Sequence, residues 1–376
     1  MPIPRLRDVA ELAGVHTATA SRALNQDTRG LVSEETAARV ANAAAQLGYN
    51  VNPIARSLKT SRSHTVGVVI PDLTNPLFPP IMRGIDDVLE PLGYSALLVN
   101  TDNDKDREAK QIASLRARQV DGLIVATALL DDPRMDRLAS EHIPLVLINR
   151  RMDSSTLPSV TGDEATGVHL AVRHLAELGH RDIAHLAGPQ TTSTGKVRLR
   201  AYRQALQDLG LPYNDDLVVD TEAWTESQGA QGLGRLFDRN VPFTAVLAGN
   251  DLHALGCYDL LRERGISCPD EISVVGFNDM PIVDKLSPSL TTVHIPQYQV
   301  GAEAARLFLD RIRDKHAPAK SVLLPLELIV RDSTRPPSSP VRSTAKLRRA
   351  PTVSRANGPT RSAAARRSTK AGSKPS

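Results

Sequence analysis

The sequence predicts an all-α helix–turn–helix segment, then an α/β core of two lobes, each built on a doubly wound parallel sheet, and finally a disordered basic tail. Three observations lead to this fold class. Residues 1–49 show helical patterns without strands, residues 63–333 alternate apolar strands with helices, and residues 334–376 contain few large apolar side chains. The length of 376 residues is enough for two or three domains.

Three short helices are expected in the N-terminal segment, over 8–13, 17–25 and 33–47. Ser33 is a good N-cap for the third helix, and Gly48 is a typical C-terminal stop. Between the first two helices, Gly14 can adopt the positive φ that a tight turn requires. This spacing is typical of a helix–turn–helix unit.

The second of these helices offers little to a hydrophobic core, because most of its side chains are small or hydroxylated. It is expected to present Thr17, Ala18, Ser21 and Arg22 outward. A slender helix of this kind fits the major groove of DNA, which is about 12 Å wide, and brings short side chains close to base edges. Arg22 can reach guanine or a phosphate, and Asn25 can donate to either. A generic short helix with a solvated polar face is the alternative that spacing alone leaves open.

Residues 50–62, NVNPIARSLKTSR, are polar and basic and predict a linker with one possible helical turn. The core that follows contains seven apolar strand runs, over 65–70, 95–100, 122–127, 144–149, 183–188, 244–249 and 272–277. Such nearly all-apolar strands, alternating with helices, predict parallel sheets covered on both faces.

The number of strand–helix units exceeds what one sheet would hold, so two similar lobes are predicted. We expect the first lobe to comprise about 63–160 with 291–320, and the second about 161–290 with 321–333. Ligands of such folds bind at the carboxyl ends of the strands, which is where polar residues should be sought.

Charge is unevenly distributed along the chain. The net charge is +4, but ten Lys and Arg residues lie beyond Pro337 and the last acidic residue is Asp332, so residues 1–336 carry −6. Residues 334–376 are too poor in apolar residues to offset the entropy of ordering, and are predicted to be disordered. A basic tail suggests a polyanion nearby, although a solvated tail that contacts nothing has the same composition.

Other classes of protein find little support in the sequence. No secretory signal and no apolar run near the roughly 18 residues of a membrane span occur, so we expect a cytoplasmic protein without a membrane partner. Cys257 and Cys268 are expected to be reduced thiols. His169 and His174 do not share a helix face, and the glycines of GPQTTSTGK, 188–196, are too far apart for a phosphate loop. We therefore expect no catalytic residue, no metal and no cofactor.

Several motifs, in order, resemble those of the lactose/galactose repressor family of bacterial regulators. They are RDVAELAGVHTATASRALN, SEETAARVANAAAQLGYNVNPIARSLKT, VGVVIPDLTNPLF, VLINRR, AGNDLHALGCYDLLRERG and ISVVGFNDMP. The resemblance covers residues 5 to about 332. It implies a core like that of periplasmic sugar-binding proteins, a homodimer or tetramer, and double-stranded DNA with a pseudo-palindromic operator as partner.

The resemblance also assigns roles on the DNA side. Thr17, Ala18 and Arg22 match the base-reading positions of the recognition helix. NPIARSLKT matches a hinge helix, in which Leu58 wedges into the minor groove and Ala55 lies one turn earlier on the same face. The headpiece departs from the family at His16, where a serine usually caps the helix, and at Ala20, where valine usually packs. Either Thr17 caps instead or the helix begins at another residue, and Ala20 should loosen the headpiece by roughly 1–2 kcal/mol.

On the ligand side, the resemblance places a small-molecule effector, sugar-like, between the lobes. The matching residues lie at strand ends or the helix starts that follow: Asp72, Asn75, Phe78, Asn149, Arg150, Arg198, Trp224, Asn250 and Asn278. Amides, carboxylates and an aromatic face suit a polyhydroxylated ligand. Asn149 and Asn278 replace the aspartates of many sugar-binding relatives, so the ligand need not be a neutral hexose. Asp72, Asp163 and Asn250 could alternatively serve only as helix caps.

These expectations describe a transcriptional regulator, a repressor, whose operator affinity an effector controls. Two rivals share the two-lobed fold. A solute-binding protein would need an export signal and no DNA-reading head, and an enzyme of sugar or nucleotide metabolism would need a reactive constellation. The identity of the effector and the sign of its action are not encoded in any motif.

Overall fold

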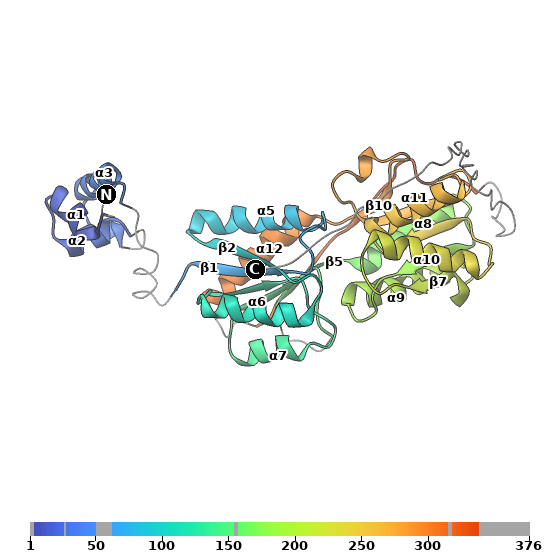
Figure 1. Ribbon diagram of the computed structural model, residues 1–376, viewed down its shortest axis with the longest axis horizontal. Helices are drawn as coiled ribbons and strands as arrows, with labels where there is room; N and C mark the ends of the chain where they lie inside the picture. Colours follow the sequence, from blue (N-terminus) through green and yellow to red (C-terminus); the bar gives the residue numbers. More distant parts are fainter. Residues whose placement is uncertain (1–3, 26–27, 50–61, 154–156, 315–317, 338–376) are drawn as a thin grey trace, which may run out of the picture. The chain divides into compact units, whose positions relative to one another are not determined.

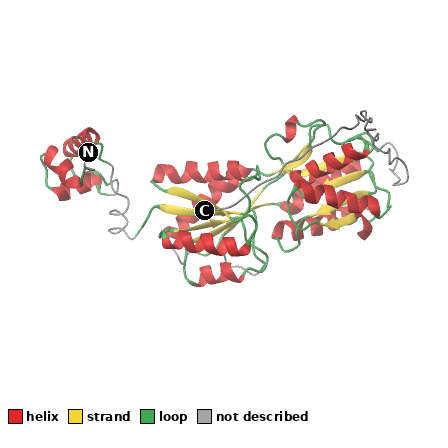
Figure 2. Ribbon diagram, viewed as in Figure 1, coloured by secondary structure: helices red, strands yellow, loops and turns green. Residues whose placement is uncertain are grey.

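The computed structural model describes residues 4–25, 28–49, 62–153, 157–314 and 318–337 (Figures 1 and 2). The N-terminal headpiece consists of α1 (Leu6–Leu12), α2 (Thr17–Ala23), the 3₁₀ turn η1 (Arg29–Leu31) and α3 (Glu34–Leu47). Its core is small, and its fully buried centre is Val9, Ala20 and Val40. The headpiece helices thus match the expected order, with bounds shifted by one or two residues.

The ends of the headpiece helices follow local chemistry. Ser33 caps α3, because its side chain accepts from the Thr36 backbone N–H, and Gly48 ends the helix with a φ of 63°. Both predictions are confirmed. Gly14 also has a φ of 63°, which supplies the turn between α1 and α2.

The first lobe is a six-stranded sheet in the order β11-β5-β4-β3-β1-β2, with every pair parallel. Its strands are β1 (Thr65–Ile70), β2 (Ser95–Asn100), β3 (Gly122–Val125), β4 (Leu145–Ile148), β5 (Ser159–Gly162) and β11 (Ser321–Leu324). One face packs on α5 (Phe78–Leu89) and α12 (Gln297–Arg313), and the other on α6 (Lys105–Ala117) and α7 (Pro133–Ser140). Burial on both faces explains the apolar runs.

The second lobe repeats this plan in the order β12-β10-β9-β8-β6-β7, with only β12 antiparallel to its neighbour. Its strands are β6 (Ile183–Ala187), β7 (Val218–Asp220), β8 (Ala245–Ala248), β9 (Ser273–Asn278), β10 (Thr291–His294) and β12 (Glu327–Ile329). Helices α8 (Glu164–Glu177) and α9 (Ser193–Asp208) cover one face, and α10 (Glu226–Asp238) and α11 (Asp251–Arg264) the other. The prediction of two doubly wound parallel sheets is confirmed.

The points where the chain passes between lobes differ from the predicted ones. Residues 291–320 were expected in the first lobe, but β10 pairs with β9 in the second sheet. Residues 321–333 were expected in the second lobe, but β11 pairs with β5 in the first. Both predictions were wrong for these strands, because a strand's sheet is decided by long-range pairing that its own residues do not reveal.

The C-terminal boundary of the folded core also lies later than expected. Ser333 is fully buried, and its hydroxyl donates to the Val274 carbonyl at 2.6 Å. The backbone carbonyl of Arg335 accepts from His180 Nε2 at 2.9 Å. Residues 334–335 are therefore anchored to the second lobe, contrary to the prediction that the tail begins at 334. The prediction for 338–376 lies outside the described residues.

Two further points concern the chemistry of the chain. Cys257 and Cys268 are free thiols, as expected. In the described ranges, no helix combines the length and the apolar character needed to cross a membrane.

Candidate functional site

The outward face of α2 carries the side chains expected to read DNA. Ala20 and Ala23 are buried against the other headpiece helices, whereas Ala18 and Arg22 are exposed. Thr17, Ser21 and Asn25 are half-buried beside them. The helical period therefore separates a packing face from a face of small side chains with one guanidinium. Contact of these five residues with DNA stays a prediction.

His16, rather than Thr17, is the N-cap of α2. The Nδ1 atom of His16 accepts a hydrogen bond from the Ala18 backbone N–H at 3.2 Å, and α2 begins at Thr17. Imidazole therefore takes the place of the usual serine as the cap, and Thr17 does not cap instead. The predicted minor-groove residues Ala55 and Leu58 lie outside the described residues.

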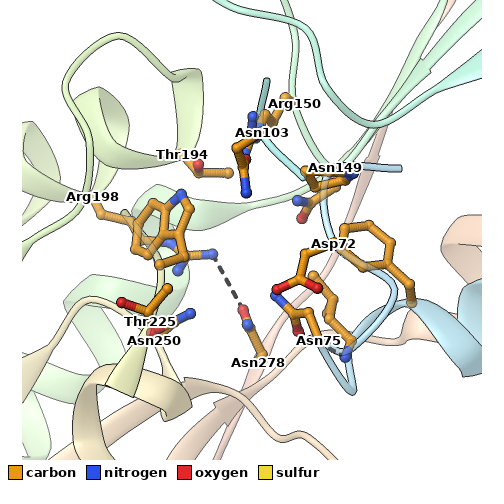
Figure 3. Close-up of a pocket in the computed structure, with 14 residues that line it drawn as sticks. Asp72, Asn75, Asn103, Asn149, Arg150, Thr194, Arg198, Thr225, Asn250 and Asn278 are labelled. Carbon is orange, nitrogen blue, oxygen red and sulfur yellow. Dashed lines mark hydrogen bonds between the residues drawn. The ribbon is translucent and has the colours of Figure 1, made fainter. Parts of the chain in front are cut away.

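A single pocket between the two lobes collects all nine predicted effector residues (Figure 3). Five further residues line it that the sequence did not indicate: Pro71, Leu77, Asn103, Thr194 and Thr225. The strand ends of both sheets open toward this pocket, as expected for parallel α/β sheets. The structure thus brings the residues together, while their contact with an effector stays a prediction.

Asn250 and Asp72 line the pocket and also accept hydrogen bonds from nearby backbone N–H groups, whereas Asp163 caps a helix without lining the pocket. Asn250 caps α11 by accepting from the His253 N–H at 2.9 Å, and it still lines the pocket. Asp72 Oδ1 accepts from the Thr74 N–H and hydroxyl at 2.8 and 2.7 Å, and Asp72 also lines the pocket. Asp163 caps α8 and is not among the lining residues.

The guanidinium of Arg198 donates hydrogen bonds to three protein acceptors. Its Nε donates to Glu164 Oε2 at 2.5 Å, and Nη1 to the Gly249 carbonyl at 2.5 Å. Its Nη2 donates to Asn278 Oδ1 at 3.5 Å, the contact dashed in Figure 3. The guanidinium also stacks 3.7 Å from the centre of the Phe277 ring. Its charge is therefore balanced by Glu164 inside the protein.

Trp224 forms an aromatic wall of the pocket, backed by a buried histidine. Its ring stacks on His253 with centroids 5.4 Å apart and planes 23° apart. Burial lowers the pKa of His253 to about 4, so the ring is neutral near pH 7. Such a flat face is an apolar platform on which a sugar or base can stack.

The backbone at Asn278 is strained and firmly clamped. Its φ is 120°, a value that side chains rarely adopt, and Asn149 across the pocket has a φ of 61°. Gln297 Nε2 donates to the Asn278 carbonyl at 2.7 Å, and the Ile295 N–H donates to the same oxygen. Strain held by such contacts is characteristic of binding sites.

The residues of the pocket do not suggest metal chemistry. Over the described ranges, no group of three or more His, Cys, Asp or Glu side chains has an arrangement that could hold a metal ion. The lining instead offers five asparagines, two threonines, one tryptophan, two arginines and one aspartate. These groups bind and orient a polar ligand.

A two-lobed ligand-binding core joined to a helix–turn–helix headpiece defines the class of protein. Residues 5–52 match the family described as bacterial regulatory proteins, lacI family, and residues 172–334 match the periplasmic binding protein-like domain. The regulator DegA of Bacillus subtilis (strain 168) is 35% identical over 88% of this chain and 97% of its own.

Solved structures agree with this assignment. The lac repressor dimer bound to operator and an anti-inducer matches with a TM-score of 0.77 and 28% identity, covering 88% of this chain and 99% of that one. The complex of the regulator CelR with cellobiose matches with a TM-score of 0.68 and 30% identity over the same shares. The chain belongs to the lacI family of bacterial regulatory proteins, which confirms the resemblance seen in its motifs.

Proposed function

We propose that this protein is a DNA-binding transcriptional repressor whose operator affinity is set by a small molecule in the inter-lobe pocket. The observation that carries the proposal is the joint presence, in one chain, of an exposed recognition face on α2 and a polar pocket lined from both lobes. It works in the cytoplasm, without catalysis and without a cofactor. The structurally similar lac repressor dimer, bound to operator and to an anti-inducer, supports this assignment.

DNA recognition follows from the shape and charge of α2. Ala18 and the hydroxyl-bearing Thr17 and Ser21 keep the helix slender, so its axis can approach the base edges closely. Arg22 is exposed and free to make a bidentate contact with guanine. Asn25 follows the C-cap of α2, and its side chain can contact the sugar–phosphate backbone.

Recognition by two copies of the chain implies a pseudo-palindromic operator. The core offers surfaces for such a two-fold contact. Strand β2 is at the edge of the first sheet, and its apolar residues 96–99 remain half-exposed. Leu73 and Ile282 expose 54% and 63% of their surface, which is high for apolar side chains. An exposed edge strand can pair with a second copy, and exposed apolar side chains can pack against one.

The proposal is tested by selecting duplexes from a randomised pool with the full-length protein. Wild type should enrich a pseudo-palindrome. Arg22→Ala should bind that sequence with affinity lower by about 1–3 kcal/mol, roughly five- to 150-fold, and lose most discrimination against random DNA. Arg39→Ala is the matched control, because Arg39 is an exposed headpiece arginine on α3 rather than α2. Equal losses for both variants on operator and random DNA would contradict base reading by Arg22.

A further inference from the structure

Arg150 is a buried cation without a counter-ion in the described chain. It follows β4, lines the pocket and is only 5% exposed. Its Nε has no hydrogen-bond acceptor, and no carboxylate of the described residues lies within ion-pairing distance of its guanidinium. Burying an unpaired guanidinium is unfavourable by several kcal/mol, so such an arrangement calls for an explanation.

Glu108, the acid whose charge acts on Arg150, is engaged elsewhere, and so is Asp132. Glu108 accepts hydrogen bonds from the Thr127 hydroxyl and, at 2.8 Å, from Arg134 Nη1. Asp132 caps α7 by accepting from two backbone N–H groups of its first turn. Burial lowers the pKa of Arg150 to about 10, so it remains a cation at neutral pH. Among the residues that the structure describes, Arg150 therefore has a distant attraction to Glu108 but no direct partner.

Arg198 provides an internal comparison in the same pocket. It is 3% exposed, nearly as buried as Arg150, but its Nε lies 2.5 Å from the Glu164 carboxylate. Of two buried arginines that line one pocket, the fold neutralises one and leaves the other unpaired. The missing partner of Arg150 is thus a group that the described residues do not provide.

The remaining lining suits an anion at the Arg150 end of the pocket. In Figure 3, the side chains of Asn103 and Arg150 lie together at the top of the view, while Asp72 and Asn75 lie lower and to the right. The amide of Asn103 can donate a hydrogen bond alongside the guanidinium. Asp72 is the only carboxylate of the lining, and its Oδ1 is already bound by Thr74.

We propose that the effector is a polyhydroxylated molecule bearing an anionic group, a carboxylate or a phosphate, and that this group pairs with Arg150. The proposal rests on the proposed function in one respect, since it takes the inter-lobe pocket as the effector site. A charge-assisted, two-pronged contact to the guanidinium satisfies the buried cation and fixes the orientation of the ligand. The asparagines and Trp224 then contact its hydroxyl-bearing body.

The first test needs no ligand and compares the melting temperatures of full-length Arg150→Met and Arg198→Met. Removing an unpaired buried cation should leave the melting temperature unchanged or higher, because no partner is orphaned. Removing Arg198 leaves Glu164 buried and alone, and should lower it by more than about 6 °C. A fall in Arg150→Met as large as that in Arg198→Met would show that Arg150 has a structural partner, and would overturn the proposal.

The second test supplies the anion. Sulfate, inorganic phosphate, D-glucose 6-phosphate, D-ribose 5-phosphate and D-glucuronate are compared with D-glucose, D-ribose and sodium chloride at equal ionic strength. At least one anionic sugar should bind wild type about tenfold or more tightly than its neutral parent, and Arg150→Met should lose that advantage. Preference for the phosphates or for glucuronate identifies the anion. Equal binding of neutral and anionic sugars, no binding of any anionic probe, or an undiminished advantage in Arg150→Met would each overturn the proposal.

These readouts are independent of DNA. If the protein selected no operator, the repressor function would fail while the melting and anion-binding results for Arg150 would stand. If Arg150 showed no anion dependence, operator selection by α2 would be unaffected. The two failures are therefore distinguishable.

Discussion

Replacing Gly188 with alanine should displace the aromatic wall of the pocket. Gly188 directly follows β6, and a Cβ placed on it would lie 1.8 Å from Cη2 of Trp224 and 2.2 Å from Cζ2. Carbon atoms in contact are normally about 3.5 Å apart, so the ring must withdraw by about 1.7 Å. The ring already stacks on His253, and a Cβ built on Gly249 would lie 3.0 Å from its Cζ3, so little space remains for it to move deeper.

The size of the effect follows from what the ring loses. Stacking on His253 contributes about 0.5–1.5 kcal/mol, and forcing a methyl group into a packed site costs about 1–3 kcal/mol. The free energy of unfolding of Gly188→Ala should therefore fall by about 1.5–4.5 kcal/mol. Any ligand that stacks on Trp224 should also bind more weakly.

The assay uses the fact that Trp224 is the only tryptophan in the chain. Its emission maximum and its quenching by acrylamide report on the pocket, and thermal unfolding reports on stability. In Gly188→Ala, emission should shift to the red and quenching should increase. Gly234→Ala in α10 is the control, because its Cβ would meet only Leu260 at 3.8 Å, an ordinary contact. That variant should be as stable as wild type or more so.

An unchanged emission spectrum together with a wild-type melting temperature in Gly188→Ala would refute this reasoning. It would mean that the ring does not rest on Gly188. Trp224 would then not form a wall of the pocket.

Three further predictions concern other parts of the molecule. Asp251 is fully buried, and burial raises its pKa to about 7. Because the folded protein holds a proton that the unfolded chain releases near pH 4, wild type should lose stability relative to Asp251→Asn as pH rises from about 4 to about 7. Parallel curves of stability against pH for the two proteins, from denaturant titrations, would contradict this. Gly14→Ala puts a residue with a Cβ at a left-handed φ, so amide exchange in α1 and α2 should accelerate about fivefold or more. Gly14→Asn is the control and should show a smaller acceleration. Equal acceleration in both variants would argue against backbone strain. A chain ending at Pro337 lacks ten cations, so its affinity for operator and for random DNA should fall alike and should depend less steeply on salt concentration. An unchanged dependence of DNA affinity on salt would show that the tail does not contact DNA.

Much of the fold could be predicted because its strands are buried on both faces. All seven apolar runs became strands, within two residues of their expected ends. The strands that the apolar pattern of the sequence did not predict are short or contain polar residues. Strand β7 has three residues, β5 reads SVTG and β10 reads TTVH. Serine and threonine look like turn residues locally, and only pairing with neighbouring strands makes these segments extended.

The nine predicted pocket residues were assigned from the resemblance to the repressor family, and their position at strand ends supported that assignment. Asn149, Asn250 and Asn278 each lie at or just after the end of a strand, where the topology gathers ligands. Asn103 lies in a loop without a distinctive pattern, and Thr194 lies in GPQTTSTGK, a stretch whose sequence was weighed only as a phosphate loop. The contrast between Arg150 and Arg198 could not be foreseen, since it depends on which distant carboxylate each arginine reaches in the fold.

Coupling between DNA recognition and the ligand pocket is measured by the affinity of a pocket ligand, followed through Trp224 fluorescence, with and without saturating operator. If the two sites are coupled, operator changes ligand affinity, and by the same factor by which the ligand changes operator affinity, as thermodynamic linkage requires. A ligand that perturbs Trp224 fluorescence and binds equally well with and without operator would contradict the coupling.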